Sequence, residues 1–158
     1  MLGFGHKSVI IASPIDGSVV PVSQLSDPVF KEDVLGKGVA IIPVDGGGCV
    51  TAPADAEISL MFDTGHAVSL VTKSGVELLI HVGIDTVKLK GKHFTMHKKS
   101  EDNVKTGDLL MEFDADAIAK EGYESATPVV VCNPDNYKEI TFAAEGPIKA
   151  GDPLITLR

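Results

Sequence analysis

The chain has no tryptophan, only two tyrosines and only two cysteines among its 158 residues. Cys49 and Cys132 lie far apart without a CxxC spacing, which favours a reducing cytoplasm, and we interpret both as small core residues. No apolar run approaches the ~18 to 20 residues of a membrane-spanning helix. The amino-terminal MLGFGHK is too short for a targeting segment. These absences predict a cytoplasmic protein without direct membrane insertion.

Positively charged residues are also relatively few. The 14 basic residues are outnumbered by 22 acidic ones, giving a net charge of −8. This balance argues against nucleic acid and anionic lipid as partners and favours a basic protein surface. With 44% hydrophobic residues, residues 1–158 can bury the core of one domain, in which we expect residues 1–7 to be frayed. We expect a monomer.

Short apolar runs separated by Gly, Pro, Asp and Ser dominate the rest of the sequence. They are SVIIA, GVAII, AEISLMF, AVSLVT, VELLIHV, DLLMEF, PVVVC and PLITL. Their length and spacing predict an all-β sandwich or barrel. Only residues 114–122 have a helical pattern, with Asp114 placed to cap the helix and Gly122 to end it.

Two pairs of segments echo each other. ASPIDGSVV (12–20) aligns with TAPADAEIS (51–59), and VKTGDLL (104–110) aligns with IKAGDPL (148–154). The shared Lys-x-Gly-Asp predicts a tight turn in which Gly adopts positive φ. The echoes suggest an internally duplicated architecture, although similar turn chemistry alone would explain matches this short.

The segment GHAVSLVTKSGVELLIH (65–81) carries two histidines at its ends. An antiparallel hairpin turning at residues 73–74 would place His66 directly opposite His81, with Cβ atoms roughly 4.5–5.5 Å apart. A shift of one residue would put the two rings on opposite faces, so the pairing depends on the turn. The hydroxyl of Thr64 could fix the tautomer of the His66 ring.

Strand alternation also predicts what surrounds the histidine pair. Leu79 would flank His81, and the opposite face would carry Val76, Leu78, Ile80 and Val82. Asp85 follows Gly83 and is either a turn residue or part of the site. We interpret three other histidines as surface residues and assign them no role: His6, His93 and His97.

Three chemistries suit such a face. In phosphoryl transfer, one neutral imidazole attacks phosphorus while the other hydrogen-bonds the equatorial oxygens. A zinc-dependent hydrolase could use His66, His81 and Asp85 as ligands, although the sequence lacks a clear third histidine or an HxH pair. A biotinyl or lipoyl carrier domain would need an MKM-like hairpin, which is absent.

The segment ELLIHVGIDTVKLKG closely resembles the active-site signature of the glucose-family enzyme IIA component of the bacterial phosphoenolpyruvate-dependent sugar phosphotransferase system. Further segments resemble blocks of this family in the expected order and cover nearly the whole chain. They are LSDPVFKEDVLGKGVAIIP, TAPADAEIS, FDTGHAVSLVTKSGVELLIH, VKTGDLLMEFD and TPVVVCN.

The resemblance implies a β-sandwich of barrel-sandwich type, a duplicated hybrid motif with at most one or two short helices. It implies that His81 accepts phosphate from the histidine phosphocarrier protein (HPr) and passes it to a cysteine of the enzyme IIB domain of a membrane sugar permease. His66 matches the histidine that stabilises the phosphate, and Thr64 matches the threonine that orients His66.

The resemblance also implies a partner-binding rim. Leu79 and Val82 stand where relatives often carry phenylalanine, and GKHF (91–94) replaces an acidic-glycine GEGF, which bears on the choice of partners. The rim comprises Asp27, Phe30, Phe62, Leu79, Val82 and Asp85. No cofactor is required, although the pair of His66 and His81 could bind zinc opportunistically.

Overall fold

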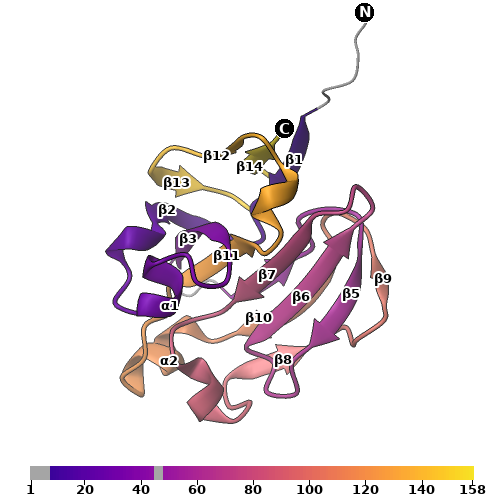
Figure 1. Ribbon diagram of the computed structural model, residues 1–158. Coiled ribbons are helices and arrows are strands. Elements are labelled where there is room, and N and C mark those ends of the chain that lie inside the picture. Colours follow the sequence, from indigo (N-terminus) through magenta and orange to yellow (C-terminus); the bar gives the residue numbers. More distant parts are fainter. Residues whose placement is uncertain (1–7, 45–47) are drawn as a thin grey trace, which may run out of the picture.

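The computed structural model describes residues 8–44 and 48–158, and strands are the main regular secondary structure of the described chain (Figure 1). The expected frayed segment 1–7 lies outside these residues. Two short helices, α1 (Pro28–Lys31) and α2 (Ala115–Lys120), accompany the strands, in agreement with the predicted all-β class. The strands are β1 (Val9–Ala12), β2 (Gly17–Pro21), β3 (Lys37–Pro43), β4 (Cys49–Thr51), β5 (Ala56–Met61), β6 (Ala67–Thr72), β7 (Glu77–His81), β8 (Phe94–Met96), β9 (Asn103–Val104), β10 (Leu109–Phe113), β11 (Thr127–Val131), β12 (Ile140–Phe142), β13 (Gly146–Ile148) and β14 (Pro153–Leu157).

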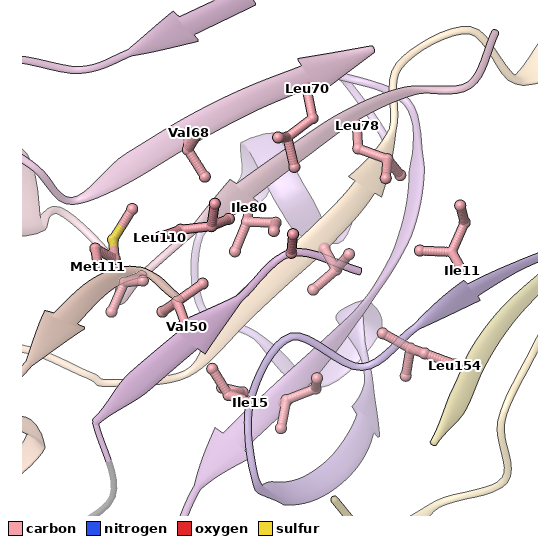
Figure 2. Close-up of a cluster of buried hydrophobic side chains, with 14 of the residues drawn as sticks. Ile11, Ile15, Val50, Val68, Leu70, Leu78, Ile80, Leu110, Met111 and Leu154 are labelled. Atoms are coloured by element: carbon pink, nitrogen blue, oxygen red, sulfur yellow. The ribbon is translucent and has the colours of Figure 1, made fainter. Parts of the chain in front are cut away.

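Three antiparallel sheets form the two layers of the sandwich. The described strands give one eight-stranded sheet in the order β13-β2-β3-β11-β7-β6-β5-β9, and two three-stranded sheets, β1-β14-β12 and β4-β10-β8. Figure 2 shows side chains from β6 and β7 pointing into the same space as side chains from β4 and β10. The main core therefore lies between the large sheet and the small sheets, as in other face-to-face sheet packings.

Alternation along β6 and β7 fills this main core. Val68 and Leu70 of β6 and Leu78 and Ile80 of β7 are buried against Val50, Leu110 and Met111 from the facing layer (Figure 2). Burying one aliphatic side chain of this size contributes about 1.5–3 kcal/mol. The inward face predicted for the second strand of the hairpin is confirmed, since its four members are buried: Val76, Leu78, Ile80 and Val82.

A second apolar cluster covers the opposite face of the large sheet. We call it the outer cluster; its buried members are Val22, Leu25, Phe30, Ala40, Ala67, Leu79, Ile84, Ala126 and Val130. Helix α1 and the 3₁₀ turn η1 (Val22–Gln24) supply the cover. Asp27 caps α1, because its carboxylate accepts a hydrogen bond from the N–H of Val29 at 2.8 Å. Figure 1 shows α1 beside the carboxyl end of β7.

The two Lys-x-Gly-Asp segments form matching turns. The carboxylate of Asp108 accepts from the N–H of Lys105 at 2.8 Å, and that of Asp152 accepts from the N–H of Lys149 at 3.0 Å. The glycine of each turn has positive φ, as predicted.

The aspartates of the other echoed pair bind these same turns. Asp55 accepts from the N–H of Thr106 at 2.9 Å, and Asp16 accepts from the N–H of Ala150 at 2.8 Å. Segments 12–20 and 148–154 thus repeat the hydrogen-bonding pattern of segments 51–59 and 104–110, which supports the predicted duplication.

A third turn of this kind contains no glycine. The carboxylate of Asp102 accepts from the N–H of Lys99 at 2.9 Å, and Glu101 takes the left-handed position with φ 76°. Because a non-glycine residue is strained there, we expect Glu101→Gly to raise the unfolding free energy by about 0.5–1 kcal/mol. Urea denaturation would measure it. Glu101→Ala removes the same charge without relieving the backbone, so an equal gain from alanine would contradict the explanation.

Two further expectations have different outcomes. Helix α2 lies where the sequence predicts it, capped by Asp114 and followed by Gly122 at φ 91°. The prediction that Cys49 and Cys132 are core residues is wrong, because both are exposed. Cys49 lies on the edge strand β4, whose alternation buries Val50 instead, and Cys132 follows the last residue of β11.

No helix within residues 8–44 and 48–158 combines the length and the hydropathy needed to cross a lipid bilayer.

Candidate functional site

The hairpin that carries the histidines has a different register from the predicted one. Ala67, rather than His66, is opposite His81. The cause is a connection one residue longer than expected: the N–H of Thr72 donates to the carbonyl of Val76 at 2.9 Å, leaving three residues in the loop. The predicted register is therefore wrong by one residue.

The two imidazoles nevertheless meet. Their ring centroids lie 4.9 Å apart, with an interplanar angle of 79°. His66 precedes the first residue of β6 and follows Gly65, whose φ is 69°, so it lies in a bend where strand alternation does not set side-chain direction. The predicted contact between His66 and His81 is confirmed, although a bend rather than cross-strand pairing creates it.

His81, at the end of β7, has a defined tautomer. Its Nδ1 lies 2.7 Å from the carbonyl oxygen of Gly83. A carbonyl only accepts hydrogen bonds, so Nδ1 carries the proton and Nε2 keeps its lone pair. The ring is half-buried and packs 5.2 Å from the ring of Phe30 in the outer cluster. Nε2 has no hydrogen-bond partner among the described residues, which leaves its lone pair available to a ligand.

His66 is almost enclosed, with 3% of its surface exposed. Its Nδ1 lies 2.5 Å from Oγ1 of Thr64, and its ring meets that of Phe62 edge-on at 5.5 Å. When the threonine hydroxyl donates to Nδ1, the ring proton resides on Nε2. His66 can then donate a hydrogen bond to a group bound beside His81.

Burial keeps both rings neutral. Burial, and to a smaller extent the charge of a protonated His81, lowers the pKa of His66 to about 4. Burial also lowers the pKa of His81, while the hydrogen bond to Gly83 and the carboxylates of Asp27 and Asp85 oppose that shift. A neutral nucleophile and a neutral hydrogen-bond donor are therefore present together at pH 7.

The buried His66 makes stability depend on pH. Its folded pKa lies below the value of 6.5 for free histidine, so the unfolded chain binds the proton more strongly and stability is lost as pH falls below 6.5. We expect the unfolding free energy to decrease by about 1–2 kcal/mol between pH 7 and pH 5. Urea denaturation at both pH values would measure the decrease. His66→Gln should show a shallower dependence, and parallel curves for the two proteins would contradict this origin.

Gly83 contributes to the site through its backbone. The next amide, that of Ile84, is not free to bind a ligand, because it donates to the carbonyl of Glu124 at 3.0 Å. The contribution of Gly83 is its carbonyl, which fixes the tautomer of His81.

Substitution of Gly83 should strongly destabilise the folded protein. Its φ is 81°, and an added Cβ would lie 2.4 Å from Cγ2 of Thr86 and 2.8 Å from the carbonyl oxygen of Glu124. We expect Gly83→Ala to lower the unfolding free energy by about 2–4 kcal/mol in urea denaturation. Gly122 is the matched control, because it has φ 91° but no neighbour within 4 Å of a built Cβ. Equal losses from the two alanine variants would show that φ alone, without the clash, is responsible.

The predicted rim residues differ in accessibility. Asp85 is exposed and Phe62 is half-buried, but Phe30 and Leu79 are buried in the outer cluster. The assignment of Val82 to the rim is wrong: it is 0% exposed and lies in the main core, because successive residues of a strand point to opposite faces. Sequence reasoning missed the exposed apolar side chains near α1 and after Asp85, namely Val29, Val34, Leu35 and Val87.

Metal ligation has little support in the described residues. They contain no group of three or more His, Cys, Asp or Glu side chains placed to hold an ion. His66, His81 and Asp85 are thus not arranged as the ligand set that a zinc hydrolase would need.

Comparison with known proteins agrees with the fold. Residues 9–137 match the model of the phosphoenolpyruvate-dependent sugar phosphotransferase system, EIIA 1. The chain is 39% identical over 149 residues to a glucose-specific EIIA component of Oceanobacillus iheyensis, covering 94% of this chain and 89% of that protein. It is 43% identical over 145 residues to a beta-glucoside-specific EIIBCA component of Dickeya chrysanthemi, covering 92% of this chain but only 23% of that protein.

A solved structure is also similar. Glucose permease IIA from Mycoplasma capricolum matches with a TM-score of 0.90 and 33% identity, over 99% of this chain and 100% of that one. The agreement of sequence and structure extends over both layers of the sandwich. The chain therefore belongs to the EIIA 1 family of the phosphoenolpyruvate-dependent sugar phosphotransferase system.

Proposed function

We propose that this chain is a phosphocarrier in which His81 accepts a phosphoryl group from HPr and transfers it to a cysteine of an enzyme IIB domain. The observation that carries the proposal is the free Nε2 of His81, held by the Gly83 carbonyl beside the ring of His66. In this proposal the phosphocarrier is a cytoplasmic monomer and requires no cofactor.

The accepting step needs no base. Nε2 of His81 attacks phosphorus, and the new N–P bond forms as the N–P bond of the donor phosphohistidine breaks. The bonding electron pair returns to the ring nitrogen of the donor. The proton on Nδ1 stays in its hydrogen bond with Gly83, so a neutral His81 is competent without losing a proton.

The onward step depends more strongly than the accepting step on a hydrogen bond from His66. The acceptor is a thiolate, so a negatively charged sulfur approaches a negatively charged phosphoryl group. The S–P bond forms while the N–P bond breaks, and the electron pair returns to Nε2 of His81. A hydrogen bond from His66 to the equatorial oxygens offsets the repulsion in this step. Thr64 supports it by holding the His66 ring in the required tautomer.

The surroundings suit a protein that docks other proteins. The carboxylates of Asp27 and Asp85 act on His81 and offer complementary charge to a basic donor surface. Phe62, which contacts the ring of His66, and the exposed Val29, which precedes Phe30, add apolar contact area.

Intact-mass spectrometry at alkaline pH tests the proposal. The chain is incubated with phosphoenolpyruvate, enzyme I and HPr, and the expected result is the gain of one acid-labile phosphate. Fragmentation of the product should locate the phosphate on His81. The proposal fails if the complete donor system adds no phosphate to the chain, or adds it to another residue.

A further inference from the structure

The segment between α2 and β11 connects two parts of the site. The N–H of Ile84, in the turn that follows His81, donates to the carbonyl of Glu124 at 3.0 Å. The hydroxyl of Ser26, just before the capping residue of α1, donates to Oε1 of the Glu124 carboxylate at 2.7 Å. One residue therefore bonds both the turn that presents His81 and the segment that begins α1.

Glu124 is itself anchored on both sides along the chain. The N–H of Tyr123 donates to the carbonyl of Ile118 in α2 at 3.2 Å. On the other side, Ala126 is buried in the outer cluster. The exposed carboxylate of Glu124 thus extends from a backbone that is fixed to the folded protein, and it can hold Ser26 in place.

This hydrogen bond has no equivalent between the two parts that it connects. Among residues 8–44 and 48–158, no hydrogen bond runs directly from residues 22–36 to residues 81–87. The two parts otherwise meet through packing in the outer cluster, including the ring of Phe30 against that of His81 at 5.2 Å. Apolar packing is non-directional, whereas a hydrogen bond to a carboxylate is directional and strong for its kind.

The segment that follows Ser26 carries three side chains important to the site. Asp27 caps α1, and its charge acts on His81. Val29 is exposed, and Phe30 packs on the His81 ring. The position of Ser26 therefore affects where a carboxylate, an exposed apolar side chain and an aromatic ring lie relative to His81.

Resting on the proposed phosphocarrier function, we propose that Glu124 is a positioning residue that holds α1 in its docking position before a partner protein arrives. A partner then meets side chains that are already ordered, so the free-energy cost of ordering them is not added to binding. The carboxylate of Glu124 acts through Ser26 and takes no part in the transfer of the phosphoryl group.

Glu124→Ala tests this role, because it releases Ser26 but keeps the carbonyl that bonds Ile84. His81 also keeps its hydrogen bond to Gly83, so its reactivity should be retained. In rapid-quench measurements of acceptance, we expect the half-saturating concentration of phosphorylated HPr to rise by about threefold to tenfold. The rate at saturation should stay within about twofold of wild type.

Ser26→Ala should have the same effect, since it removes the other partner of the same hydrogen bond. The double variant should then be no worse than either single variant. Additive losses would show that Ser26 and Glu124 act independently, and the proposal would be wrong.

Glu124→Gln separates the hydrogen bond from the charge. Its amide oxygen can still accept from Ser26, so the half-saturating concentration should return to within about twofold of wild type. Glu112→Ala is the matched control, because it removes an exposed carboxylate on β10 that contacts Nε2 of His97 at 2.7 Å. Impairment of the glutamine variant or of the Glu112 control equal to that of Glu124→Ala would overturn the proposal.

Proton NMR of the His81 ring measures the position of α1 without any partner. The aromatic ring of Phe30 shifts the resonances of the His81 ring protons, so these resonances should move in Glu124→Ala and Ser26→Ala and return to wild-type positions in Glu124→Gln. Unchanged resonances in both alanine variants would contradict the positioning role, even if urea denaturation shows a loss of stability. Failure of the phosphocarrier function has a different result: wild type then gains no phosphate from HPr, while the NMR comparison still tests Glu124.

Discussion

Replacing His81 by alanine is expected to abolish phosphate acceptance. The reason is the division of roles at the site: Nε2 of His81 is free for attack, whereas His66 is 3% exposed and directs its Nδ1 to Thr64. The described residues of the site therefore offer no second free ring nitrogen to replace it. Intact-mass spectrometry after incubation with phosphoenolpyruvate, enzyme I and HPr should show no added phosphate on the variant.

His97→Ala is the control for His81→Ala, because His97 is exposed and its Nε2 contacts the carboxylate of Glu112 at 2.7 Å rather than either ring of the histidine pair. It should be phosphorylated like wild type. Urea denaturation of both variants checks that each is folded, since removing the His81 ring also removes its contact with Phe30. Normal labelling of folded His81→Ala would show that the phosphate is carried elsewhere.

Replacing His66 by glutamine should separate the two half-reactions. Glutamine keeps an N–H donor near His81, so acceptance from HPr should fall by less than about tenfold. Transfer to IIB should fall by about a hundredfold or more, because a flexible amide holds the phosphoryl oxygens less firmly when an anionic thiolate attacks. Rapid-quench kinetics of each half-reaction, with stoichiometric partner, would measure both effects.

Thr64→Val extends the same measurement. It removes the hydroxyl that contacts Nδ1 of His66 and keeps the shape of the side chain. If the role of Thr64 is to set the tautomer, the variant should impair the same half-reaction as His66→Gln, to a smaller extent. Equal loss of both half-reactions in His66→Gln would mean instead that His66 positions His81 and does not act on the phosphoryl group.

The sequence allowed the histidine pair to be predicted, but not the path of the chain that creates it. The loop 73–75 ends in Gly75 at φ 92°, and a three-residue loop with glycine in this position is common in hairpins. That signal was present in TKSG and favours the observed register. Taken alone, this register would have placed His66 and His81 on opposite faces. The bend at Gly65, which restores their contact, depends on packing against Phe94 and Met96 from a distant strand.

The outer cluster also could not be predicted from local sequence patterns. Helix α1 has four residues, too few for a hydrophobic period, although Asp27 followed by Pro28 is a readable start signal. That Phe30 would cover β7 and meet His81 depends on how α1 folds back over the sheet. The same placement of α1 determines which of its side chains are exposed, and Val29 is one of them.

The two faces of strand β7 carry side chains in different environments. Leu78 and Ile80 are held in the main core, and the outward Leu79 is covered by the outer cluster, while Val71 and Glu77 near the hairpin loop face solvent. Exposed side chains and side chains that set the free energy of unfolding therefore alternate near the loop. The exposed positions can consequently diverge between related chains with little loss of thermal tolerance.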